Sequence, residues 1–99
     1  MNTQKEILSF LSVNREFLLN NYSVIQIALF GSFARDEQTQ TSDVDILVEF
    51  KDDIKNIYDV KSSLKNFLSN AFERSVDLAR IKYLKPYAKE SILKDAKYV

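Results

Sequence analysis

Residues 28–48 read ALFGSFARDEQTQTSDVDILV and contain Gly31, the only glycine of the 99-residue chain. This segment begins within a short, branched and apolar run, residues 24–30, and ends within a second apolar run, residues 44–50. Short runs of this kind, bounded by turn residues, predict buried strands. We therefore expect two strands, with a one-turn helix at residues 32–36 in the polar connection between them. That connection is longer than the usual ~4–6 residues, and long ordered loops in compact domains are often functional.

The first 21 residues have the pattern of one helix. Thr3-Gln-Lys-Glu6 has the form of a capping box, in which the Thr and Glu side chains satisfy backbone amides at the helix start. Apolar residues follow at helical spacing, at positions 7, 10, 11, 17 and 18. We expect this helix to end near Asn20-Asn21.

The C-terminal half predicts a further helix, a strand and a last helix. Asp52-Asp53 are expected to cap a long helix whose apolar positions continue to Ala71. Residues 76–81 (VDLARI) predict a third strand, and Pro86 suits the first turn of the last helix. The order αβ(α)βαβα indicates an α/β (α+β) fold, a small β-sheet flanked by helices, in a single domain over residues 1–99.

The composition excludes several kinds of site. Without cysteine the chain forms no disulfide and no thiolate zinc site, and without histidine it lacks the commonest general base and imidazole ligand. Its chemistry must therefore use carboxylates, hydroxyls, Lys, Arg or Tyr, and oxygen-rich sites of this kind suit hard cations such as Mg²⁺. A single glycine also excludes the dinucleotide fingerprint and the P-loop, because each of them needs at least two.

The charges and the apolar segments lead to expectations about DNA binding, membrane association and cellular location. The 14 basic and 14 acidic residues balance, so we expect no direct DNA binding of the kind that coats a duplex. The sequence has no N-terminal signal pattern and no apolar run near the ~20 residues of a membrane span. We therefore expect no membrane association and a cytoplasmic location.

Three aspartates are placed to share one surface. Because alternate side chains of a strand point to opposite faces, Asp43 and Asp45 lie on one face while Val44 lies on the other. Asp77 alternates in the same way in the third strand, and it comes beside them if the second and third strands are neighbours. Two unit charges ~4 Å apart repel by roughly 4 kcal/mol at an effective dielectric constant of about 20. Such a cluster must be spread out in water, protonated or neutralised by cations, and carboxylates, water and phosphate oxygens are the usual ligands of Mg²⁺.

Gly31 and Ser32 are candidates for phosphate binding. A glycine at the end of a strand adopts backbone conformations that are closed to other residues and lets a phosphate approach the main chain. Ser32 offers a hydroxyl and an amide at a helix start, where anions are favoured. Each feature alone also has an ordinary explanation, since a Gly-Ser pair often forms a plain turn and an Asp-x-Asp pair often arises by chance. The functional interpretation depends on the conjunction of both with a further Asp in an apolar strand.

The order of these residues resembles that of a known superfamily. Gly31-Ser32, ten residues and Asp43-Val44-Asp45 match the signature of the DNA polymerase β-like nucleotidyltransferases. The fuller string GSFAR…TSDVDILVEF is similar to its minimal branch, the MNT proteins. Residues 75–99, SVDLARIKYLKPYAKESILKDAKYV, resemble the tail of that branch, in which a third acid follows a β-branched residue and Leu-x-Pro precedes the last helix. The chain departs from many relatives at Asp36, where they have glycine.

The resemblance implies a mixed sheet of three or four strands flanked by helices. In such a protein Asp43 and Asp45 would bind two Mg²⁺ ions, and Asp77 would help to activate the attacking hydroxyl. Gly31 and Ser32 would hold the triphosphate of ATP. Proteins of this branch are commonly antitoxins paired with a HEPN-type ribonuclease toxin, and they transfer AMP to a tyrosine of that toxin. The resemblance therefore implies a magnesium-dependent protein adenylyltransferase whose partner is a cognate HEPN toxin.

Other residues have more than one interpretation. Arg35 could reach a phosphate or lie on the surface of the short helix. Ser42 could hydrogen-bond near the nucleotide or cap the turn before the second strand. Glu49 is expected to be solvated. The Lys-rich segment 82–97 and the tyrosines are candidates for packing or partner contacts.

Two alternatives to catalysis on a partner protein stay open. The domain could neutralise its partner by binding alone, with a vestigial nucleotide site. It could also transfer nucleotides to a small molecule, as the aminoglycoside nucleotidyltransferases do. The size of the chain speaks against this last alternative, because relatives of that kind carry additional domain material that shapes the acceptor pocket.

Overall fold

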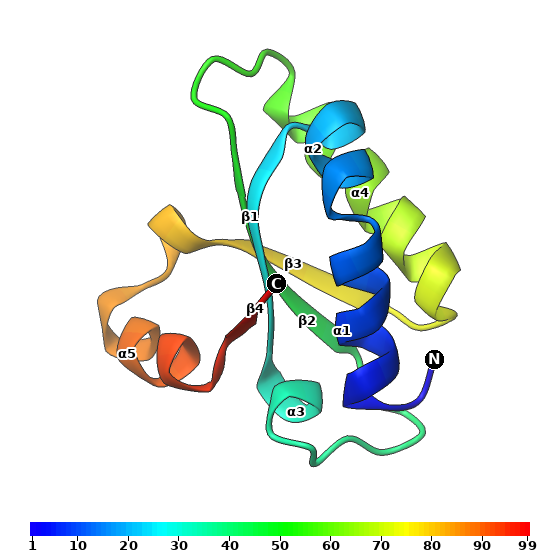
Figure 1. Ribbon diagram of the computed structural model, residues 1–99. Coiled ribbons are helices and arrows are strands. Elements are labelled where there is room, and N and C mark those ends of the chain that lie inside the picture. The colour runs from blue at the N-terminus through cyan, green and yellow to red at the C-terminus, as the bar shows by residue number, and fades with distance from the viewer.

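Four strands form one mixed sheet in the order β3-β2-β1-β4. In the computed structural model, which describes residues 1–99, β1 (Val24–Phe30) pairs antiparallel with β2 (Val44–Phe50). β2 pairs in parallel with β3 (Val76–Arg80), and β4 (Lys97–Tyr98) pairs antiparallel with β1 at the other edge. Figure 1 shows the sheet nearly edge-on, with helices on both sides. The expected mixed sheet flanked by helices is therefore confirmed.

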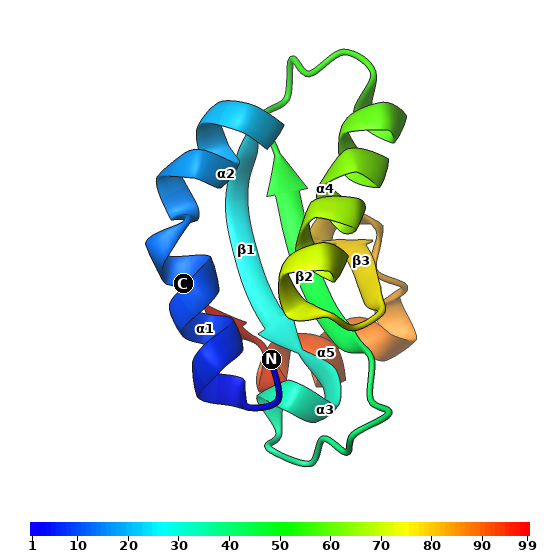
Figure 2. The ribbon, with the colours of Figure 1, turned by 90° about the vertical axis from the view of Figure 1, so that its right-hand side faces the viewer.

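The two faces of the sheet are covered unequally. α1 (Gln4–Val13), α2 (Arg15–Tyr22) and α4 (Ile57–Phe72) lie on one face, which is turned toward the viewer in Figure 2. The other face carries α5 (Pro86–Asp95), which follows the 3₁₀ turn η1 (Ile81–Tyr83). None of these helices combines the length and the apolar character that crossing a membrane requires.

Alternation along β2 separates the core from the second face. The apolar residues at its even positions, 44 to 50, are buried in a core cluster of 16 side chains under α1, α2 and α4. The odd positions point away from that core, and they include Asp45 and Glu49. A slip of one residue would turn both acids into the core, so the hydrophobic pattern determines the register.

The central strands occupy the predicted ranges. β1 and β2 match them, β3 ends one residue earlier than expected, and α3 (Gly31–Ala34) falls near the predicted one-turn helix. The strand pattern did not indicate β4, because two residues are too few for a periodicity. β4 joins the sheet through its pairing with Ala28 and Leu29.

Two predicted helices are wrong in extent, and both differ from expectation at an asparagine. The capping box at Thr3 is confirmed, but the N-terminal helix breaks at Asn14, whose Nδ2 donates to the carbonyl of Phe10 at 2.9 Å and competes with the helical backbone. The long helix begins at Ile57 and not at Asp52-Asp53. Asn56, the residue directly before this helix, has a left-handed backbone conformation with φ of 57°. A left-handed residue does not continue a right-handed helix, so the helix does not extend back toward Asp53.

Candidate active site

The acidic residues meet where β2 and β3 run side by side. Asp45 lies opposite Asp77 in the parallel register, and on its other side it lies opposite Phe30 of β1. Asp43 is two residues earlier, directly before β2, and both Asp43 and Asp77 are exposed. The prediction that the second and third strands are neighbours is therefore confirmed, and the three aspartates lie at one end of the sheet.

Asp45 is the acid whose charge is least compensated. The pKa of its carboxyl is raised from 3.8 to about 6, mainly by burial and then by the charges of Asp77 and Asp43. A hydrogen bond with Asp77 also favours the protonated form of Asp45, whereas the charge of Arg35 acts in the opposite direction. A cation bound near Asp45 would relieve this accumulation of negative charge.

The position of Asp45 also explains the glycine. Gly31 has φ of +72°, a backbone conformation that L side chains rarely adopt. A Cβ atom on Gly31 would lie 2.9 Å from Cγ of Asp45 and 3.1 Å from its Cβ, and closer still to Oδ2. Only glycine therefore lets the end of β1 lie directly against this carboxylate. The unusual backbone conformation that we expected is confirmed, and phosphate contact at Gly31 stays a prediction.

The donor set fits a hard divalent cation. All three side chains are carboxylates, which Mg²⁺ prefers. The raised pKa of Asp45 reflects its burial first and then the negative charges of Asp77 and Asp43, which a cation would offset. The three do not form a ready-made site with three protein ligands, since no group of three acidic side chains comes close enough to hold a metal ion. Asp43 lies outside the paired part of β2. Metal binding by Asp43, Asp45 and Asp77 stays a prediction.

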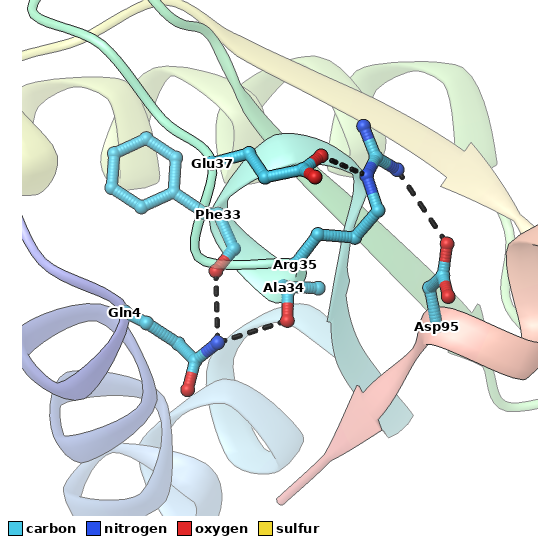
Figure 3. Close-up of polar contacts among 6 residues, drawn as sticks. All are labelled: Gln4, Phe33, Ala34, Arg35, Glu37 and Asp95. Carbon is cyan, nitrogen blue, oxygen red and sulfur yellow. Dashed lines mark hydrogen bonds and ion pairs between the residues drawn. The ribbon is translucent and has the colours of Figure 1, made fainter.

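Arg35 follows α3 and is held by two carboxylates (Figure 3). Its Nε donates to Oε1 of Glu37 at 2.8 Å, and its Nη1 lies 3.5 Å from Oδ2 of Asp95 in α5. The hydrogen bond with Glu37 and the nearby Asp95 raise the pKa of the guanidinium, which remains exposed. These contacts place Arg35 on the surface, between α3 and α5. Its contact with a phosphate stays a prediction.

The end of α3 is anchored from α1. Nε2 of Gln4 donates to the carbonyls of Phe33 and Ala34 at 3.0 and 2.9 Å (Figure 3). The carbonyl of Phe33 also accepts from the amide of Asp36 at 3.2 Å, whereas Gln4 gives the carbonyl of Ala34 a partner that the short helix does not supply. Gln4 was not among the predicted site residues, because its partners lie about thirty positions away in the sequence.

Ser32 and Ser42 lie at the two ends of the polar loop. Ser32 is half-buried, and its carbonyl accepts from the amide of Glu37 at 2.8 Å. Oγ of Ser42 accepts from the amide of Thr39 at 2.8 Å, which is the turn-capping interaction that we considered for it. Nucleotide contacts of both serines stay predictions.

Glu49 is not solvated, contrary to expectation. Its Oε2 lies 3.2 Å from Nη2 of Arg80, and the two side chains are only 12% and 14% exposed. Its Oε1 accepts from the amide of Lys82 at 2.8 Å. Arg80 also lies over the rings of Phe50 and Tyr83. The chain after β3 folds back over Glu49, and this tertiary contact has no local signal in the sequence.

The sequence matches the family described as "Nucleotidyltransferase domain" over residues 11–99. The protein named "Putative protein adenylyltransferase MJ0126" of Methanocaldococcus jannaschii is 40% identical over 100 residues, and the match covers 100% of both chains. Protein adenylyltransferase MntA of Thermococcus cleftensis is 32% identical over 99 residues, and the match covers 100% of this chain and 98% of MntA. Similarity of this extent shows the family.

Solved structures share the fold. A protein described as a "putative minimal nucleotidyltransferase" superposes with a TM-score of 0.79 over 96% of this chain and 94% of its own, at 23% identity, which shows the fold alone. A chain of a toxin-antitoxin complex with AMP-PNP is 27% identical and superposes with a TM-score of 0.67, over 85% of this chain and 67% of that chain.

The sequence signature, the structure and the relatives agree. The signature from Gly31 to Asp45 spans the start of α3 and the start of β2, and β3 brings Asp77 to the same place. The chain belongs to the nucleotidyltransferase-domain family, and within it to the minimal MNT branch of protein adenylyltransferases.

Proposed function

We propose that this chain transfers AMP from ATP to the tyrosine hydroxyl of a cognate HEPN-type ribonuclease toxin in the cytoplasm, and thereby acts as the antitoxin. The observation that carries the proposal is the position of Asp45, which lies opposite Asp77 and directly against Gly31. Carboxylates that attract a cation thus adjoin a backbone that a phosphate can approach. The full-length relative MntA supports the reaction type, and the similar chain in a toxin-antitoxin complex with AMP-PNP supports ATP and a toxin partner.

The proposed reaction is one displacement at phosphorus. The acceptor oxygen bonds to the α-phosphorus of ATP, and the bond from that phosphorus to the oxygen bridging toward the β-phosphate breaks. Pyrophosphate leaves with the electron pair of that bond, and the hydroxyl proton passes to a carboxylate and then to solvent. We assign the proton to Asp77, because it is exposed beside Asp45. A carboxylate in this role makes a histidine base unnecessary.

The remaining residues bind and orient the nucleotide in this proposal. Asp43 and Asp45, with Asp77, would hold two Mg²⁺ ions, which when bound supply neutralising charge and polarise the phosphoryl oxygens. Gly31 and Ser32 bind the triphosphate through the main chain at the start of α3. Arg35 is close enough to influence the pKa of Asp45, and its planar guanidinium suits a phosphate.

A protein acceptor suits the surface around the acids. Asp43 and Asp77 are exposed, so a macromolecular surface can reach them. Next to β3, the η1–α5 segment exposes Tyr83 and Tyr87, at 67% and 84%. Large exposed aromatic side chains are enriched at protein interfaces, and this supports a protein partner on the α5 side of the sheet; Tyr83 itself lies against Arg80, at the end of β3 opposite Asp77.

The proposal is tested by incubating the protein with Mg²⁺, a candidate HEPN-type toxin and ATP labelled at either the α- or the γ-phosphate. We expect the α-label on the toxin and no γ-label. The double variant Asp43→Ala, Asp45→Ala and removal of Mg²⁺ with EDTA should each abolish labelling. The matched control is Asp52→Ala, Asp53→Ala, which removes two exposed acids just after β2 and should label normally.

Each alternative predicts a different result. Equal labelling by the Asp43→Ala, Asp45→Ala variant would exclude the proposed site. If that variant labels nothing but still suppresses toxicity in cells, the chain neutralises its partner by binding alone. An α-label on an aminoglycoside in the absence of any protein partner would favour a small-molecule acceptor.

A further inference from the structure

The side chain of Arg74 is enclosed by the polar loop between α3 and β2. Its Nη1 donates to the carbonyls of Thr39, Gln40 and Ser42, at 3.1, 3.2 and 2.8 Å. Its guanidinium lies over the ring of Phe33, 5.0 Å from the centroid. Three carbonyls of this loop and one aromatic ring of α3 thus converge on one side chain from the turn between α4 and β3.

The N-terminal segment completes this enclosure. Nε of Arg74 donates to the carbonyl of Met1 at 2.8 Å, and Nη2 donates to Oδ1 of Asn2 at 3.0 Å. The backbone of Arg74 is fixed as well, because Oγ of Ser69 donates to its carbonyl at 2.7 Å. An arginine held at so many points, including its own main chain, has one position relative to the loop.

The contacts of Arg74 lie at both ends of the loop. Phe33 belongs to α3, which begins at Gly31 and Ser32, and the carbonyl of Ser42 belongs to the peptide bond that precedes Asp43. Within the loop, the amide of Ser42 donates to the carbonyl of Thr39 at 3.2 Å, so the bound segment is itself a closed turn. Arg74 therefore connects the predicted phosphate-binding end of the loop to its predicted metal-binding end.

We propose that Arg74 is a positioning residue, which fixes Asp43 relative to Gly31 and Ser32 and so sets the geometry in which the metal-bound nucleotide is held. The proposal rests on the function proposed above. Lysine cannot replace this arginine, because an ammonium group is a point charge without the planar set of five donors that reaches several carbonyls while stacking on a ring. Arg74 acts through the loop and touches none of the three aspartates in the contacts that the structure gives it.

The test compares Arg74→Lys with Arg15→Lys, which makes the same substitution at an exposed arginine of α2. Native-state hydrogen exchange is measured on the amides of Thr39 and Ser42, which are hydrogen-bonded in the loop, and on a core amide of β2. We expect exchange of the loop amides to become about tenfold faster in Arg74→Lys, with the core amide unchanged. Leu64→Val, a core substitution in α4, shows what general destabilisation alone does to both groups of amides.

The second measurement is Mn²⁺ binding in the presence of a non-hydrolysable ATP analogue, which needs no turnover. Arg74→Lys should weaken binding about 10-fold, within the range found when groups that orient metal ligands are lost. In the transfer assay the metal concentration for half-maximal rate should rise by a similar factor, while the rate at saturating metal changes less. Leu64→Val should change neither the Mn²⁺ affinity nor the metal concentration for half-maximal rate.

Two results of the exchange measurement would overturn the inference. One is unchanged loop exchange in Arg74→Lys, and the other is equal acceleration of loop and core amides, as in Leu64→Val. If the unaltered protein transfers no AMP, the proposed reaction fails, and the exchange and Mn²⁺ measurements still decide the role of Arg74. Faster loop exchange without any change in Mn²⁺ affinity would show a purely structural role and would also contradict the proposal.

Discussion

Asp45 and Glu49 both occupy odd positions of β2, and their surroundings are opposite in charge. Glu49 is paired with Arg80 and also accepts from the amide of Lys82, so its negative charge is compensated. Asp45 faces Asp77 and Asp43, and its pKa is raised to about 6. The negative charge at the Glu49 end of the strand is thus balanced and stabilises the fold, whereas the negative charge at the Asp45 end is left uncompensated. An acid on this sheet indicates a site only where its charge is left uncompensated.

The largest expected effect is on the rate of AMP transfer, and it distinguishes Asp45 from Glu49. Asp45→Asn should lower the rate of AMP transfer on the order of 10³-fold, because in the proposed mechanism Asp45 is a metal ligand, and its loss would remove several kcal/mol of charge stabilisation in the transition state. Glu49→Gln, on the same strand, should lower the rate less than about tenfold at a temperature well below unfolding. Rates are measured with α-labelled ATP, and similar losses in both variants would remove the distinction.

The second effect concerns the stability of the protein and arises at the end of β2 where Glu49 is paired with Arg80. Glu49→Gln leaves the charge of Arg80 nearly buried without a counter-ion, and we expect a loss of about 2–3 kcal/mol in the free energy of unfolding by urea. This is below the value for fully buried pairs, since both side chains keep some exposure. A change below about 0.5 kcal/mol would mean that solvent already screens the pair.

The third effect is also on stability and concerns Gly31, at the end of β1, where the backbone lies directly against Asp45. Gly31→Ala should cost about 2 kcal/mol, because φ is +72° and the new Cβ would overlap the carboxylate of Asp45. In an Asp45→Ala background the overlap with the carboxylate disappears and only the 3.1 Å approach to the Cβ of residue 45 remains, so the cost should fall to about 1 kcal/mol, mostly from the backbone. Equal costs in both backgrounds would show that the backbone conformation, and not Asp45, requires the glycine.

The smallest effect is the pH dependence of stability. The folded protein holds the proton of Asp45 up to about pH 6, whereas the ordinary pKa of the group is 3.8. The corresponding stability is therefore fully present below the ordinary pKa and is lost as the pH rises through about 6. Because Asp45 is only half-buried, solvent screening reduces the expected loss to about 1 kcal/mol.

Urea unfolding of the metal-free protein at pH 4.5 and 7.5 measures this loss. The same measurement on Asp45→Asn gives the contribution of the other carboxyl groups, which is then subtracted. The variant should lose about 1 kcal/mol less than the unaltered protein between these conditions. Mg²⁺ added at pH 7.5 should stabilise the unaltered protein more than the variant, because a cation offsets the ionised form. Identical pH profiles for the two proteins would exclude the uncompensated charge as their cause.

The sequence predicted those parts of the molecule that depend on local pattern. β1 and β2 follow from branched apolar runs, and the proximity of Asp45 and Asp77 followed once two strands were taken as neighbours. The break at Asn14 and the late start of α4 at Ile57 depend on backbone conformations of single asparagines, which a periodicity does not record.

Local sequence patterns could not predict the contacts that hold the site together. Arg74 binds carbonyls, which every residue has, at positions more than thirty residues away. Glu49 and Arg80 meet because β3 returns in parallel to β2, and nothing near either residue in the sequence distinguishes this pair from two surface charges. The contact of Gly31 with Asp45 depends likewise on the pairing of β1 with β2, since Phe30 lies opposite Asp45.

The parallel pairing of β2 with β3 also has a consequence for biosynthesis. Parallel neighbours need a crossover connection, here provided by α4, so Asp77 emerges from the ribosome long after Asp43 and Asp45. A nascent chain that stops within α4 carries the glycine, the serine and two of the acids, yet lacks the third. Only a chain translated beyond β3 assembles the complete trio.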